Sequence, residues 1–96
     1  MPIVYILLCA DGSYYVGQTR NLDRRLDAHH AGTAAPFTRD RPPVRLVYSE
    51  PLPTASDTAR RERQIKGWAR AKKQALVRGD LGASQELSKR RGTRRG

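Results

Sequence analysis

The feature that most constrains this chain is a pair of short β-prone segments on either side of one tight turn near the N-terminus. Residues 3–9 (Ile-Val-Tyr-Ile-Leu-Leu-Cys) form an apolar run that is rich in β-forming side chains. Asp11-Gly12 is a hairpin signal, and residues 13–19 (Ser-Tyr-Tyr-Val-Gly-Gln-Thr) have the composition of a second strand. We therefore expect an antiparallel hairpin, in which Gly17 marks either a bulge or the close approach of another group.

A helix and a third strand are expected after the hairpin. Asn21 is a good N-cap for a helix over residues 22–30, and Gly32 is a natural stop. Residues 32–43 contain three prolines, which favour a loop. Residues 44–49 (Val-Arg-Leu-Val-Tyr-Ser) have the composition of the third strand.

The chain after the third strand is expected to be mostly helical. Thr54 and Asp57 have the spacing of a capping box, with Asp in place of the usual Glu. The helix that follows runs to about residue 77 and has a point of interruption near Gly67. The order β-β-α-β-α predicts an α+β fold, in which helices pack on a three-stranded antiparallel sheet.

Length and charge limit the organisation and the partners of the chain. With 96 residues it can form one small domain, which we expect over residues 1–82. Residues 83–96 are expected to hold a short helix, over 83–89, and a basic, disordered tail, over 90–96. The formal net charge is +10, and the part before Lys89 still carries 14 bases against nine acids. A nucleic acid is the partner that best suits this charge.

Three classes of protein are disfavoured. Cys9 is the only cysteine, which excludes an intramolecular disulfide framework and a cysteine-rich zinc site. The N-terminal apolar run is too short to cross a membrane and lacks the basic start of a signal peptide. No strongly hydrophobic amphipathic segment supports binding to a membrane surface. We expect a cytoplasmic location, with association with the nucleoid as a variant of it.

Arg25 is a charged residue on a helix face that should be apolar. Leu22, Leu26 and His29 form one stripe of the predicted helix. Arg25 lies on that stripe, whereas Arg24 points nearly the opposite way. Since a buried charge is costly unless it is paired or used, Arg25 is a candidate functional residue. The alternative is that its stem covers the core edge while the guanidinium stays in water.

Glu62 has the same property in the next long helix. It falls on the face of Ala59 and Ile65, while the arginines beside it in the sequence point elsewhere. In a basic protein, one Arg and one Glu in a pocket suggest phosphodiester chemistry, with a cation for the phosphate and a carboxylate for a metal ion. The alternative is a surface ion pair between Glu62 and Lys66, one turn later.

Aromatic and histidine side chains are expected near these charges. Tyr5 and Tyr15 share one face of the hairpin if the register permits, whereas Tyr14 faces the other side. His29 has a better helical phase for burial than His30. Each of these residues could also be an ordinary core or helix-end residue. No second His or Cys lies at metal-ligand spacing, so a His-based zinc site is not expected.

Four segments with these residues follow one another in order. They are Val4-Tyr5, Tyr15-Val16-Gly17, Asn21-Leu22-x-Arg24-Arg25-Leu26-x-x-His29 and Arg61-Glu62-x-x-Ile65-Lys66. Together they resemble the GIY-YIG nuclease domain, over residues 3–77. The chain is most similar to the small stand-alone bacterial group of that family, and also to the catalytic half of a structure-specific endonuclease that cuts branched DNA. One departure is that Ile3-Val4-Tyr5 stands where the name motif has Gly-Ile-Tyr.

The resemblance implies a role for each matching residue. Arg25 matches the catalytic arginine, and Glu62 matches the metal-binding glutamate. The other implied site residues are the two motif tyrosines Tyr5 and Tyr15, His29 one turn after the arginine, and Gly17, which lets the backbone pass close to the site.

The implied activity is a metal-dependent endonuclease that hydrolyses phosphodiester bonds in DNA, in repair or recombination structures. One Mg²⁺ or Mn²⁺ ion would be bound by Glu62, and Arg25 would hold a non-bridging phosphate oxygen. Tyr5 would orient or deprotonate the attacking water, assisted by Tyr15 or His29. Because a phenol has a pKa near ~10, this role requires nearby positive charge that lowers the pKa.

Binding of backbone phosphates is expected from basic residues that read no sequence. The candidates are Arg39, Arg60, Lys72 and Lys73. A chain of this size could also use a protein partner or form a homodimer. Two other functions remain open from the sequence: a nucleic-acid-binding protein that is inactive or needs a partner, and a basic protein associated with RNA or the ribosome.

Overall fold

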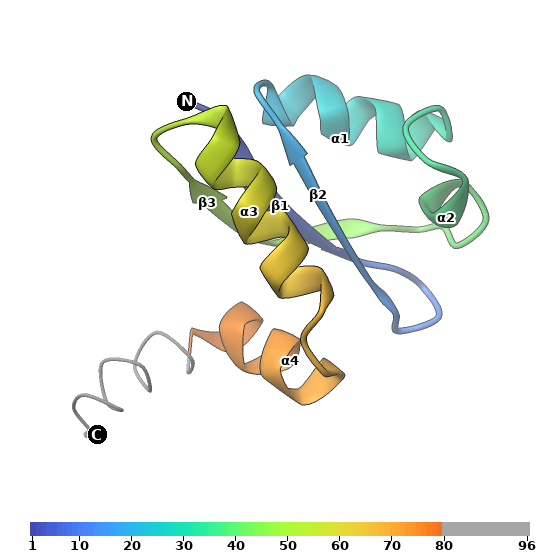
Figure 1. Ribbon diagram of the computed structural model, residues 1–96. Coiled ribbons are helices and arrows are strands. Elements are labelled where there is room, and N and C mark those ends of the chain that lie inside the picture. The colour runs from blue at the N-terminus through green and yellow to red at the C-terminus, as the bar shows by residue number, and fades with distance from the viewer. Residues whose placement is uncertain (80–96) are drawn as a thin grey trace. The chain divides into compact units, whose positions relative to one another are not determined.

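The computed structural model describes residues 1–79, which belong to two units, one of residues 1–66 and one that begins at Gly67. The first unit contains the sheet with helices α1, α2 and α3, and the described part of the second contains helix α4 (Figure 1). The helix expected over 83–89, the tail over 90–96 and the domain boundary expected after residue 82 lie outside the described residues.

The sheet has the expected three antiparallel strands. They are β1 (Ile3–Leu8), β2 (Tyr14–Thr19) and β3 (Arg45–Pro51), in the spatial order β2-β1-β3. The central strand is fully buried at four consecutive positions, from Val4 to Leu7. A strand that is covered on both faces needs such a continuous apolar run, which explains the composition of residues 3–9.

The register explains the role of Gly17. Strands β1 and β2 pair without interruption, and Tyr5 lies opposite Gly17. The irregularity of the sheet lies instead between β1 and β3, after Ile6. Of the two interpretations of Gly17, a bulge is therefore wrong for β2, and a close approach by another group remains.

The two faces of the sheet carry different layers. Tyr5 and Leu7 belong to a buried cluster against which helix α1 (Leu22–Ala31) packs, through Leu22 and Leu26. Helix α3 (Ala55–Lys66) contacts β2 and β1 and lies across them in Figure 1. The expected order β-β-α-β-α, with helices packed on the sheet, is confirmed.

The helix signals were mostly correct. The Asn21 side chain accepts a hydrogen bond from the backbone N–H of Arg24 (3.0 Å), and Gly32 ends α1 in the left-handed conformation. The loop expected over residues 32–43 is partly wrong, because it contains the short helix α2 (Pro36–Arg39). Proline is tolerated at the first position of a helix, where no N–H donor is needed.

The long C-terminal helix is divided into two. Thr54 Oγ1 accepts the N–H of Asp57 (3.0 Å) at the start of α3, as the capping pattern predicts. The helix ends at Lys66, and α4 (Arg70–Arg78) begins after Ala69. The chain breaks at Gly67, where the backbone entropy cost of a helix is greatest. No helix within residues 1–79 has the length and apolar character needed to cross a bilayer.

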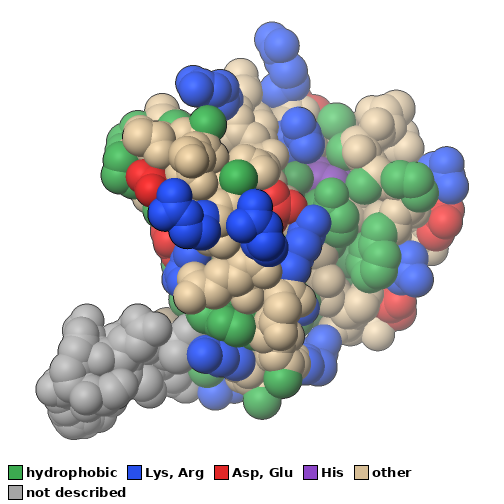
Figure 2. All heavy atoms as spheres, in the orientation of Figure 1, with side chains coloured by type: hydrophobic (Ala, Val, Ile, Leu, Met, Phe, Trp, Pro, Cys, Tyr) green, Lys and Arg blue, Asp and Glu red, His purple; other side chains and the backbone are tan. Residues whose placement is uncertain are grey.

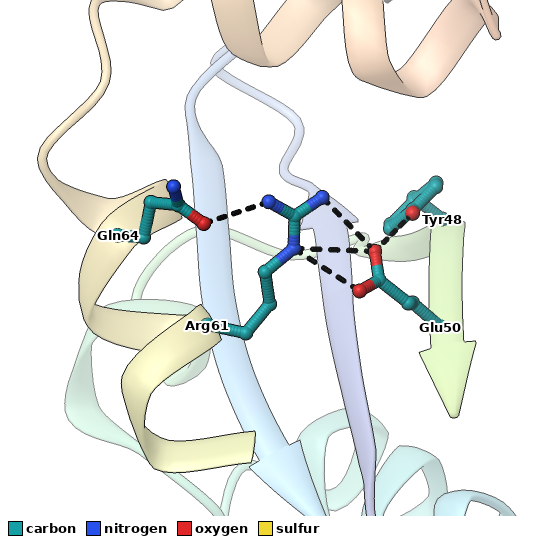
Figure 3. A network of polar contacts seen from close by, with 4 residues as sticks. All are labelled: Tyr48, Glu50, Arg61 and Gln64. Carbon is teal, nitrogen blue, oxygen red and sulfur yellow. Dashed lines mark hydrogen bonds and ion pairs between the residues drawn. The ribbon is translucent and has the colours of Figure 1, made fainter. Parts of the chain in front are cut away.

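An ion pair fastens α3 to the edge strand β3. Arg61 of α3 binds both carboxylate oxygens of Glu50, with Nε 3.1 Å from Oε2, and also donates to Gln64 (Figure 3). The hydroxyl of Tyr48 donates to the same carboxylate. Burial, followed by the contact with Glu50, raises the pKa of Tyr48 to about 12, so this phenol remains a donor.

We predict that Arg61→Ala lowers the free energy of unfolding by about 1–3 kcal/mol, because it leaves a mostly buried carboxylate without its cation. The side chains of Arg61 and Glu50 are only 21% and 22% exposed. Urea unfolding of the two proteins measures the difference. The control is Arg60→Ala, whose ion pair with Asp57 is long (3.8 Å) and exposed, and which should change stability by less than about 0.5 kcal/mol. Equal losses in both variants would contradict the anchoring role of Arg61.

Candidate active site

A chain of hydrogen bonds starts at the hydroxyl of Tyr5 on β1. Tyr5 Oη lies 2.8 Å from His29 Nε2, and His29 Nδ1 lies 2.7 Å from Thr38 Oγ1. The Thr38 hydroxyl donates its hydrogen to the carbonyl of Ala35 (3.2 Å). Thr38 must therefore accept from Nδ1–H, which leaves Nε2 as the acceptor of the Tyr5 hydrogen. The bonds thus orient a neutral imidazole on α1 with its basic nitrogen toward Tyr5.

The pKa values of this pair are shifted by burial. Burial and the nearby charge of Arg25 lower the pKa of His29, so the imidazole is neutral at pH 7. Burial, followed by Tyr15, raises the pKa of Tyr5 to about 12, although the charge and a hydrogen bond of Arg25 act in the opposite direction. Arg25 thus supplies positive charge that acts to lower the pKa of Tyr5, as the base role requires, but desolvation outweighs it.

Aromatic rings enclose these two side chains. The ring of Tyr15 lies 5.1 Å from that of His29 and 6.4 Å from that of Tyr5 (centroid to centroid). A Cβ atom at Gly17 would lie 2.6 Å from Tyr5 Oη and 3.1 Å from the Tyr15 ring. Only glycine therefore leaves space for the Tyr5 hydroxyl at this position. The prediction that Tyr5 and Tyr15 share a face is confirmed.

Arg25 lies where its helical phase predicts. It is half-buried, whereas Arg24 is exposed. Its charge acts to lower the pKa of both Tyr5 and His29. The partial burial of Arg25 and its electrostatic effect on both residues are consistent with a guanidinium near the buried pair.

Glu62 is held by two side chains. Gln18 Nε2 donates to Glu62 Oε1 (2.7 Å), and Lys66 Nζ lies 2.8 Å from Oε2. The Glu62 side chain is only 16% exposed. The ion pair with Lys66, which was the alternative interpretation of Glu62, is therefore present. The hydrogen bond with Gln18 of β2 also places Glu62 at the sheet. Its charge also reaches the Tyr5 hydroxyl, whose pKa it raises.

Arg25 and Glu62 thus act on the same hydroxyl group, from α1 and from α3. A cavity of about 230 Å³ adjoins the carboxylate and is lined by Gln18, Ala59, Glu62, Arg63 and Lys66. In residues 1–79, no cluster of three or more His, Cys, Asp or Glu side chains could hold a metal ion. One carboxylate beside a cavity of this size fits a single Mg²⁺ or Mn²⁺ that keeps most of its waters, and a two-metal cage has no ligands in this part of the chain.

The predicted phosphate-binding residues lie on the surface. Arg39 is exposed and pairs with Asp40, and Arg60 is exposed on α3. Lys72 and Lys73 are on α4 in the second unit, where the Lys72 ammonium lies 4.6 Å from the ring centroid of Trp68. Figure 2 shows Lys and Arg side chains gathered over α3, with acidic side chains among them.

Sequence reasoning missed three residues of the site. Gln18 positions Glu62, and Thr38 positions His29. Arg63 lines the cavity beside Glu62. The position of Gln18, directly after Gly17, was an available signal. Nothing in the sequence distinguishes Arg63 from its arginine neighbours.

The sheet, the two tyrosines, Arg25 and Glu62 all lie in a stretch that matches one family of catalytic domains. The chain belongs to the GIY-YIG catalytic domain family, whose profile matches residues 1–75. Among its relatives, a UPF0213 protein of Natronomonas pharaonis is 46% identical over 79 residues, which cover 82% of this chain and 93% of that protein. A UPF0213 protein of Halobacterium salinarum is 45% identical over 76 residues, 79% of this chain and 99% of that one. The solution NMR structure of a UPF0213 protein from Bacillus halodurans is 39% identical, has a TM-score of 0.55, and covers 97% of this chain and 100% of that chain.

The lowered pKa of His29 predicts a pH dependence of stability. The unfolded chain binds a proton at His29 near pH 6.5, whereas the folded protein resists it, so stability is complete above pH 6.5 and falls below it. The slope should be at most about 1.4 kcal/mol per pH unit. Urea unfolding between pH 5 and 8 should show this loss in the wild type and in the exposed control His30→Gln, but not in His29→Gln. A loss of the same size in His29→Gln would show that other groups cause it.

Proposed function

We propose that this protein is a divalent-metal-dependent nuclease that hydrolyses phosphodiester bonds in DNA, including branched structures of repair or recombination. The observation that carries the proposal is that one guanidinium and one carboxylate, from two different helices, both act electrostatically on the buried hydroxyl of Tyr5, which is hydrogen-bonded to His29. Arg25 and Glu62 come from different helices, yet both change the pKa of the Tyr5 hydroxyl. An ordinary core does not require a partly buried guanidinium and a partly buried carboxylate, since each costs desolvation energy.

Arg25 and Glu62 have complementary tasks in this proposal. The guanidinium binds non-bridging oxygens of the scissile phosphate, whose negative charge grows during attack. Glu62 holds one Mg²⁺ or Mn²⁺, with Gln18 fixing the orientation of the carboxylate. When bound, such an ion supplies Lewis-acid stabilisation of the leaving 3′ oxygen.

The Tyr5–His29 pair accepts the proton of the attacking water. The Tyr5 hydroxyl takes a proton from water as it passes its own to His29 Nε2, and the water oxygen forms the new bond to phosphorus while the bond to the 3′ oxygen breaks. A phenol with a pKa of about 12 is a poor base alone, but a relay to neutral His29 avoids the free phenolate. Because Tyr5 is fully buried, substrate binding must admit a water molecule to its hydroxyl. Tyr15 adjoins both rings and orients that water.

DNA is the proposed substrate because the charge pattern favours backbone contacts over base recognition. Arg39, Arg60, Lys72 and Lys73 are assigned to neighbouring phosphates, which position the substrate without reading its sequence. The competing function is nucleic-acid binding without cleavage. It is supported by the same basic surface, but it gives no reason for a carboxylate that is only 16% exposed and whose charge acts on Tyr5.

We predict that Arg25→Ala and Glu62→Ala each lower the cleavage rate by about 10²–10³-fold, as expected when one group that stabilises the transition state is removed. Labelled duplex, single-stranded, flap and junction DNA, and matched RNA, are incubated with and without Mg²⁺ or Mn²⁺, and binding is measured separately. Glu62→Ala should retain DNA binding. The matched control is Arg24→Ala on the solvated side of α1, which should cleave at about the wild-type rate. Failure of the wild type to cut any substrate would contradict the assignment as an enzyme. Full cleavage by Glu62→Ala would contradict the assignment of Glu62 as the metal ligand.

The pH profile of cleavage separates the relay from a free phenolate. Since His29 is already neutral above pH 6.5, kcat/KM should rise only at acidic pH and stay level from about pH 7 to 9.5. A requirement for ionised Tyr5, whose pKa is about 12, would instead raise kcat/KM about tenfold per pH unit throughout this range. Initial rates with Mg²⁺ and saturating or limiting DNA distinguish the two outcomes.

A further inference from the structure

We infer that Lys66 is the resident counter-ion of Glu62 and that a divalent ion binds by displacing its ammonium group. The inference rests on the proposed function, because it concerns the carboxylate that is assigned to the metal ion. It assigns Lys66 a role in controlling metal affinity, beyond that of a helix-surface ion pair.

The two oxygens of Glu62 are held in different ways. Oε1 accepts from the amide of Gln18, which lies on strand β2 and is partly buried. Oε2 contacts Lys66, whose side chain is 54% exposed, compared with 16% for Glu62. Rotation of the long lysine stem into water requires no change in the backbone. Oε2 is therefore the oxygen that can exchange its partner, while Gln18 keeps the carboxylate in place.

The energies permit the exchange. An ion pair with one exposed partner is screened by solvent and contributes only about 0.2–1 kcal/mol. A divalent cation carries twice the charge of the ammonium group and binds hard carboxylate oxygens directly. Lys66 therefore covers Oε2 in the metal-free protein but does not exclude the ion.

The cavity beside Glu62 gives the displaced ammonium group a place in the site. Arg63 and Lys66 both line this cavity, and Arg63 is exposed. While Lys66 neutralises Glu62, the two cancel each other's charge at the cavity wall. After exchange, the ammonium group and Arg63 can both face a phosphate of the bound strand. Metal binding and nucleic-acid binding should then strengthen each other.

Direct measurement of Mn²⁺ binding tests the displacement without any cleavage assay. The EPR signal of free Mn²⁺ is titrated with wild type, Lys66→Gln, Lys66→Arg, Glu62→Gln and Arg60→Gln, all at low ionic strength. Lys66→Gln should bind Mn²⁺ about 2- to 5-fold more tightly than wild type, since the competing cation is gone. Lys66→Arg keeps the competing charge and should bind no more tightly than wild type. Arg60→Gln removes one charge from the same helix, away from Glu62, and should change the affinity by less than about 2-fold.

The outcomes separate this inference from the function on which it rests. If Glu62→Gln loses Mn²⁺ binding but Lys66→Gln binds like wild type, the displacement is overturned and the metal assignment stands. Equal gains in Lys66→Gln and Arg60→Gln would also overturn it, because the effect would then be one of overall charge. If Glu62→Gln binds Mn²⁺ as tightly as wild type, both the displacement and the metal assignment fail.

Discussion

The hydrogen bond between Tyr5 and His29 joins the buried centre of the sheet to helix α1, and the site is organised around it. Tyr5 can place its hydroxyl there because the residue opposite it on β2 is Gly17, which has no Cβ to block the ring. Thr38 fixes the other nitrogen of His29, and burial keeps both partners neutral at pH 7. A polar pair in a dry environment is costly unless it is fully hydrogen-bonded, so its geometry is tightly constrained.

Helix α3 places the metal-binding candidate, Glu62, at one row of the sheet. Val4 of β1 pairs with Gln18 on one side and with Glu50 on the other. Two consecutive residues of α3 bind the two ends of that row: Arg61 forms an ion pair with Glu50, and Glu62 accepts a hydrogen bond from Gln18. The helix is thus fixed to both edge strands at the position where Glu62 is needed. This explains why a residue with no catalytic task, Arg61, belongs to the same architecture as the site.

Local patterns predicted most of this fold, because each depends on neighbouring residues. The apolar run, the Asp11-Gly12 turn and the Asn21 cap each produced the element they indicate. Helical phase separated Arg25 from Arg24, and Glu62 from the adjacent arginines. The interruption near Gly67 was also expected, whereas the short helix at Pro36 was missed, because a proline permits more than one local outcome.

Other features of the site could not be read from the sequence. The contact of Gln18 with Glu62 joins residues that are 44 positions apart, and the shift in the pKa of Tyr5 depends on how deeply the ring is buried. Both arise only from tertiary packing.

The central claim is that Glu62, Arg25 and the Tyr5–His29 pair form one site. NMR spectra of the protein titrated with substoichiometric Mn²⁺ test it most directly, because the paramagnetic ion broadens the signals of nuclei close to it. The structure predicts that the ring signals of His29 and Tyr5 broaden early in the wild type and stay sharp in Glu62→Gln. Early broadening elsewhere, with the His29 and Tyr5 signals unaffected, would contradict the account.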